Sequence, residues 1–182
     1  YLKMDTQHSL FPIQSKLSLN LSIGKRGLND IAGTSGSEQQ LYLDLQAMHN
    51  FYLNPKNCIN INYHNYILKS DTYFSNELYR FGGINSIRGF NENSLQGNTF
   101  SSLLTEYRLV LSPSIYIHSI MDYAYFQDKT TNLNGNLLGL GFGFGLLTKN
   151  GLFNLVYANG SKKDQAIKLS NSIVQISFKT YF

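Results

Sequence analysis

The chain has 182 residues, of which only 14% are charged and 14% are aromatic, with 13 Tyr, 12 Phe and no Trp. This length suits one domain, and so few charges are unusual for the surface of a soluble protein. The formal net charge is +4, but Lys and Arg are scattered along the chain and form no stripe, so we expect no nucleic-acid partner.

Cysteine content and hydropathy restrict the fold further. Cys58 is the only cysteine, which excludes an internal disulfide and a cysteine-based zinc site. No run of about 18 apolar residues occurs, which excludes a transmembrane helix and leaves membrane β-strands open. The sequence begins at Tyr1 without Met or an apolar signal core, so we expect it to be a mature or truncated piece.

The first clear element is the segment 16–23, K-L-S-L-N-L-S-I, in which Leu and Ile alternate with Lys, Ser and Asn. Alternation with a period of two predicts a strand that has one apolar and one polar face. The pattern recurs in chain order in about seven further segments. These segments are 40–53, 57–68, 99–111, 114–127, 136–149, 151–159 and 171–182.

Strand and loop lengths favour a membrane fold. Most of these strands have about ten residues, which exceeds the usual five or six and suffices to cross a bilayer at a tilt. Long connections alternate with tight ones, as in outer-membrane barrels that have short turns on one rim. The long ones are 26–39, 70–98, 128–135 and 160–170, and the tight ones are 54–57, 112–114 and 149–151. We therefore predict an all-β fold, an antiparallel transmembrane β-barrel; the alternative is a soluble sandwich.

Glycine occupies every second position of the segment 139–145, G-L-G-F-G-F-G. This spacing is typical of one face of a strand and argues against a phosphate-binding loop. Glycine on the inner face lets another segment approach the wall closely, or lets the wall bend.

Two acidic residues flank the S-P-S turn. If the turn centres near Ser114, Glu106 faces Asp122, and both lie on the polar side. Two carboxylates at cross-strand distance repel each other unless a cation lies between them. Arg108, on the same face, can supply that charge, and so can Arg88 if the long loop folds inward. A guanidinium bonds two acceptors at once.

A carboxylate pair is also the catalytic pattern of glycosidases. However, His8, His49, His64 and His118 have neither metal-site nor triad spacing, and no G-x-S-x-G motif occurs. We therefore expect no enzyme activity, no metal and no cofactor.

The run R-F-G-G-I-N-S-I-R-G-F at 80–90 resembles the signature loop of the BamA/TamA family of outer-membrane assembly proteins, also called the bacterial surface antigen family. That loop carries a [VI]-R-G-[FY] motif after a glycine pair, and the following F-N-E-N-S is similar to versions from Bacteroidetes. The matching residues are Gly82, Gly83, Ile87, Arg88, Gly89 and Phe90.

The resemblance implies an architecture. Family barrels have sixteen strands, of which five follow this loop, and five expected strands follow it here. The chain would be a single domain, the C-terminal half of such a barrel, with 70–98 as an inward-folded external loop. The motif arginine of the family reaches acidic residues on the next two strands, which matches Glu106 and Asp122. The end of the chain resembles an outer-membrane targeting signal, through Ile176, Phe178 and Phe182.

The resemblance also implies a function and a location. Family members assist the insertion of other proteins into the bacterial outer membrane through a lateral seam, without ATP or metal. The expected partners are outer-membrane lipid, nascent outer-membrane proteins, and periplasmic chaperones or accessory subunits, with POTRA domains upstream. The alternatives are a secretion pore of the two-partner type and a structural or adhesive barrel. Because the edges at 16–23 and 171–182 would be unpaired in lipid, we expect the chain to be part of a larger barrel.

Overall fold

The computed structural model describes residues 10, 11, 13–29, 35–162 and 168–180. Eight strands form one antiparallel sheet, in the order β1-β2-β3-β6-β7-β8-β9-β10. Their bounds are Ser15–Asn29 (β1), Ser35–Asn54 (β2), Asn57–Lys69 (β3), Thr99–Ser112 (β6), Ile115–Asp128 (β7), Leu133–Thr148 (β8), Gly151–Lys162 (β9) and Ser172–Thr180 (β10). The eight-stranded antiparallel architecture predicted from alternation is confirmed.

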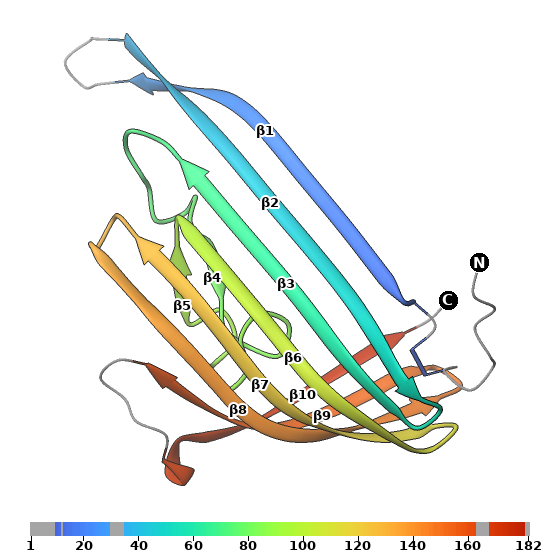
Figure 1. Cartoon of the computed structure of the whole chain (residues 1–182). Coiled ribbons are helices and arrows are strands. Elements are labelled where there is room, and N and C mark those ends of the chain that lie inside the picture. Colours follow the sequence, from blue (N-terminus) through green and yellow to red (C-terminus); the bar gives the residue numbers. More distant parts are fainter. Residues whose placement is uncertain (1–9, 12, 30–34, 163–167, 181–182) are drawn as a thin grey trace.

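The sheet is open. Strands β1 and β10 lie at its two ends, and within the described residues neither pairs with the other. Figure 1 shows a strongly curved sheet, with the tight turns β2–β3, β6–β7 and β8–β9 gathered at one end. No helix among the described residues is long and apolar enough to cross a membrane.

The two faces of the sheet differ in polarity, and the exposed, convex face is the apolar one. On β7, exposed and buried residues alternate over ten positions, and the buried ones include His118 and Asp122 while the exposed ones include Met121 and Tyr123. On β1 the side chains of Leu17, Leu19, Leu21 and Ile23 are 61 to 78% exposed. The convex face is thus apolar, and the concave face carries the polar side chains.

Three of the predicted long loops are shorter in the structure. The loop predicted at 128–135 ends where β8 begins, at Leu133. The segment 26–39 was predicted as a loop, but β1 and β2 continue to Asn29 and back to Ser35. Arg26 stands directly opposite Glu38 in the ladder and pairs with its carboxylate, so a cross-strand ion pair extends the hairpin through a Gly/Ser-rich sequence. Strand β9 likewise continues to Lys162, which pairs with Leu137.

The connection between β3 and β6 lies on the concave side of the sheet (Figure 1). It contains a small two-stranded sheet, β4 (Tyr79–Phe81) with β5 (Leu95–Gly97). Phe81 stacks on Phe100 of β6 with ring centroids 4.3 Å apart, and Tyr79 stacks on Tyr66 of β3 at 4.9 Å. These aromatic contacts hold the segment against the inner wall.

Candidate functional site

Arg88 lies on the inner wall between two carboxylates. Its Nε donates to Asp122 Oδ2 at 2.7 Å, its Nη2 donates to Asp122 Oδ1 at 2.5 Å, and its Nη1 donates to Glu106 Oε1. The backbone N–H of Arg88 also donates to Asp122 Oδ2, at 3.2 Å. Arg88 is 2% exposed and Asp122 is fully buried. A bidentate pair of this kind fixes both position and orientation of the arginine.

The register of the β6–β7 hairpin differs from the predicted one. Glu106 faces Ile120, and Asp122 faces Leu104. The turn pairs Ser112 with Ile115, and the register shifts by one further residue between Val110 and Ser112, so the two differences together move each partner by two positions. The two carboxylates are therefore diagonal neighbours on the same face, and the prediction that they stand directly opposite each other is wrong. The width of a guanidinium lets Arg88 reach both positions.

Arg108 is a second cation on Glu106. Its Nε donates to Glu106 Oε2 at 2.6 Å, and its Nη1 donates to Asn50 Oδ1 at 3.3 Å. Sequence alone left Arg88 and Arg108 as alternative partners, and the structure uses both. Two arginines and two carboxylates therefore form one charge-balanced network across β6, β7 and the loop, as a buried ionic cluster requires.

The segment before β1 contacts Arg108 through the ring of Phe11. The Arg108 guanidinium lies 4.4 Å from the ring centroid of Phe11 and 5.9 Å from that of Tyr116. Phe11 meets Tyr116 edge-to-face at 4.8 Å, and its carbonyl accepts from Tyr52 Oη at 2.5 Å. Cation–π contacts of this geometry stabilise a partly desolvated arginine. Phe11 lies in irregular chain without periodicity, so sequence patterns gave no signal for it.

The glycine pair before the motif closes a compact turn. Gly82 and Gly83 have φ of +109° and +102°, in the region that favours glycine. The N–H of Gly83 donates to the carbonyl of Ile87 at 3.1 Å, and the N–H of Gly82 donates to Ser86 Oγ at 2.8 Å. The turn sets Ile87 against the wall, fully buried, immediately before Arg88.

Three glycines let the motif lie flush against β8 and β9. Gly89 has φ +87°, and a Cβ there would lie 2.4 Å from the backbone of Asn159. A Cβ on Gly139 would lie 2.3 Å from the carbonyl oxygen of Arg88, and one on Gly160 would lie 2.5 Å from that of Gly89. The alternating glycines of β8 thus include a position where the loop contacts the wall backbone.

The apolar side chains of the motif pack into a buried cluster on the wall. Phe90 and Ile87 belong to one buried cluster with residues of β3, β6, β7 and β8. The cluster consists of Tyr66, Leu68, Phe81, Ile87, Phe90, Phe100, Ala124 and Leu137. The loop is therefore held by apolar contacts on both sides of its buried charge.

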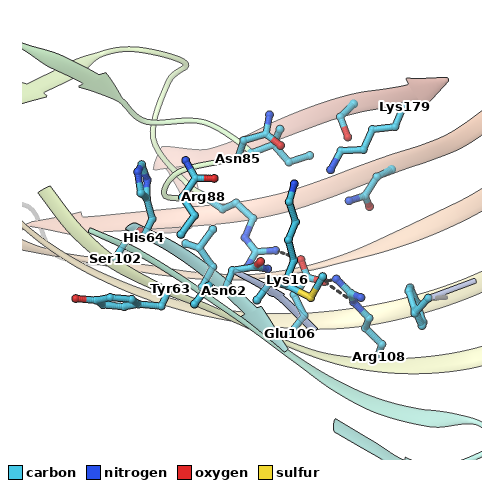
Figure 2. Close-up of a pocket in the computed structure, with 18 of the residues that line it drawn as sticks. Lys16, Asn62, Tyr63, His64, Asn85, Arg88, Ser102, Glu106, Arg108 and Lys179 are labelled. Carbon is cyan, nitrogen blue, oxygen red and sulfur yellow. Dashed lines mark hydrogen bonds and ion pairs between the residues drawn. The ribbon is translucent and has the colours of Figure 1, made fainter. Parts of the chain in front are cut away.

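The ionic network borders a cavity of about 540 Å³ on the concave side. Figure 2 shows Arg88 and Arg108 converging on Glu106, while Lys16 of β1 and Lys179 of β10 reach into the same cavity. Polar side chains such as Asn62 and His64 contribute to the lining. In the described part of the chain no group of His, Cys, Asp and Glu could hold a metal ion. The arrangement supplies positioning and charge at the inner wall.

A second arginine clamp holds the start of the long connection. Arg26 Nη1 donates to Glu77 Oε2 at 2.6 Å, its Nη2 donates to the carbonyl of Thr72 at 3.1 Å, and its guanidinium lies 4.5 Å from the ring centroid of Phe74. The Arg26 guanidinium lowers the pKa of the Glu77 carboxyl below its ordinary value. Sequence patterns gave no signal for this clamp, because Arg26 fell in a predicted loop.

The predicted targeting residues lie on the edge strand β10. Ile176 and Phe178 point to the convex face and are more than half exposed, and Phe182 lies outside the described residues. Nothing in the ionic network contacts them in the part of the chain that the structure describes. The edge strand therefore presents an apolar outer row.

No protein-family model matches the sequence, and none of the curated proteins matches it either.

Proposed function

We propose that the chain is the C-terminal half of a sixteen-stranded outer-membrane β-barrel that assists the insertion of other outer-membrane proteins through a lateral seam, as the resemblance to the BamA/TamA family implies. The observation that carries the proposal is the position of Arg88 between two carboxylates. An I-R-G-F motif from a long connection is fixed by Asp122 and Glu106 on the polar, concave face of an antiparallel sheet.

The distribution of apolar side chains supports a lipid environment. The convex face exposes rows of large apolar residues along successive strands, a surface that would aggregate in water and is satisfied in a bilayer. Within a bilayer the backbone N–H and C=O groups at a free sheet edge have no water partners. The edges β1 and β10 therefore require further strands, which a larger barrel supplies upstream.

The mechanism we infer is strand templating at β10. A free edge presents unpaired N–H and C=O groups to an incoming strand, which adds by β-augmentation. Val174, Ile176 and Phe178 project toward lipid and would guide the apolar face of the incoming strand. Arg88 would hold the inner wall in shape while the seam opens, without bond-making chemistry, ATP or metal.

The cavity favours one second candidate, a secretion pore of the two-partner type. Its lining is polar and includes Lys16 and Lys179, as a conduit for an extended polypeptide requires. Passage would need displacement of the loop that carries Arg88, because the loop occupies the concave side. A dedicated secreted partner and a rise in conductance on loop removal would favour this candidate.

Photocrosslinking separates the two. A photoreactive residue is placed at Ile176 or Phe178 on β10, and the matched control is Met121, equally exposed on the interior strand β7. Insertion through the seam predicts crosslinks to nascent barrel proteins at the two β10 positions and none at Met121. Equal labelling at all three positions, or labelling confined to cavity residues such as Lys16, would contradict the proposal.

A further inference from the structure

Gln175 on the edge strand β10 binds the backbone of the loop motif with both atoms of its amide. Its Nε2 donates to the carbonyl of Phe90 at 3.0 Å, and its Oε1 accepts from the N–H of Gly89 at 3.3 Å. The partners are separated by 85 and 86 positions in the chain, and Gln175 is 9% exposed. The contact joins the motif to the strand that ends the sheet.

The contact with Gln175 is the last in a series of contacts between the motif and successive strands of the sheet. The motif meets Glu106 on β6 and Asp122 on β7, lies on Gly139 of β8 and Gly160 of β9, and ends at Gln175 on β10. Every strand after the loop thus contributes one contact. Among the described residues, the only strand that pairs with β10 is β9.

We propose that Gln175 is a positioning residue that couples the seating of the loop to the edge strand. With Arg88 seated, the amide of Gln175 holds β10 to the motif and so fixes the strand's place at the sheet edge. When the loop leaves its seat, β10 keeps only its ladder with β9 and becomes free to move. The relevance of this coupling to a lateral seam rests on the proposed function. The coupling itself is inferred from the contacts of Gln175 alone.

The chemistry at this position requires an amide. Gly89 offers a donor and Phe90 an acceptor, and the glutamine amide supplies one of each, spaced like a peptide group. Leucine has a similar volume and neither group, so Gln175→Leu leaves a buried N–H and a buried C=O without partners. Gln175→Glu keeps an acceptor for Gly89 and places a negative charge against the carbonyl of Phe90.

Hydrogen exchange on the full-length protein in lipid nanodiscs tests the coupling. Gln175→Leu should raise the exchange rates of the β10 amides bonded to β9, and those of the motif amides, each by about tenfold. Arg88→Ala should raise the β10 rates in the parent protein and add little in Gln175→Leu, because both changes break one connection. The control Ser177→Ala changes the next side chain on the same face of β10 and should leave both sets of rates unchanged.

The outcomes are distinct. Unchanged β10 exchange in Gln175→Leu, or rates in the double variant that equal the product of the single effects, would overturn the coupling. If Gln175→Leu does not fold, Gln175→Asn carries the same test, since it keeps the amide and shortens its reach. Exchange is measured without any client protein, so a failed crosslink at β10 would refute insertion while leaving this result standing.

Discussion

Arg88 and Asp122 form a bidentate ion pair in which one carboxylate accepts from both Nε and Nη2 of the guanidinium and also from the arginine's own backbone N–H. Asp122 is fully buried, so this carboxylate receives three donors from one residue in place of water. Side chain and backbone of Arg88 are thereby fixed together. The conformation of the loop and the charge of the wall depend on each other.

Removal of Arg88 leaves Asp122 without its compensating charge. Arg88→Ala should destabilise the loop by about 3 to 5 kcal/mol, and by less where water reaches the concave face of the sheet. Arg88→Lys should give an intermediate loss, because one ammonium cannot reproduce the fork. Limited proteolysis of segment 79–90 measures the effect. Arg80→Ala is the matched control, since Arg80 lies in the same connection and is exposed; equal proteolysis of the Arg80 and Arg88 variants would contradict a latch.

Glycine is required at position 89 for two reasons: its φ is +87°, and a side chain there would meet the backbone of β9. Gly89→Ala places a methyl group 2.4 Å from the backbone of Asn159 in a strained conformation, so the motif must lift away from β9. We expect a loss of about 1 to 3 kcal/mol and increased proteolysis of the loop. Gly24→Ala is the control, because nothing lies within 4 Å of its Cβ position. A stable, protected Gly89→Ala loop would show that the close approach is not required.

Periodicity predicted the strands but could not predict every contact between them. Each strand has two chemically different faces, so alternation locates it in the chain, and parity placed Glu106 and Asp122 on one face. The register was missed because alternation fixes neither the position of the turn, which pairs Ser112 with Ile115, nor the one-residue bulge next to it. Contacts between a loop and a distant strand, such as Gln175 with Phe90, carry no local pattern at all.

Residue composition gave one wrong loop prediction, for a related reason. Glycine and serine between 26 and 39 predicted a loop, but the ladder continues because Arg26 and Glu38 pair across it. The stabilising partner of each residue is visible only once the register is known. The low intrinsic strand preference of glycine and serine is therefore outweighed by cross-strand pairing at this hairpin.

The ring of Phe11 packs against the guanidinium of Arg108, which also bonds Glu106. Phe11→Leu keeps the apolar volume and removes the aromatic face. It should lower the free energy of unfolding of the sheet by about 0.5 to 2 kcal/mol, measured by thermal unfolding. Phe11→Tyr keeps the ring and should restore most of that loss. Phe51→Leu is the control, since Phe51 is an exposed aromatic residue on the sheet. Equal unfolding of Phe11→Leu and Phe11→Tyr would mean that only volume matters there.

The clamp between Arg26 and Glu77 gives the connection a pH dependence. Arg26 lowers the pKa of Glu77 in the folded protein, so the clamp's contribution is present above the unfolded pKa of about 4.3 and is lost as pH falls through the folded pKa. Hydrogen exchange of segment 70–78 should therefore be slow at neutral pH and, after correction for intrinsic rates, should accelerate below about pH 4. Glu38 also bonds Arg26, so Glu77→Gln is needed to assign the change to Glu77. That variant should exchange faster at neutral pH and show a smaller acid response, and an identical pH profile in the two proteins would exclude Glu77 as the titrating group.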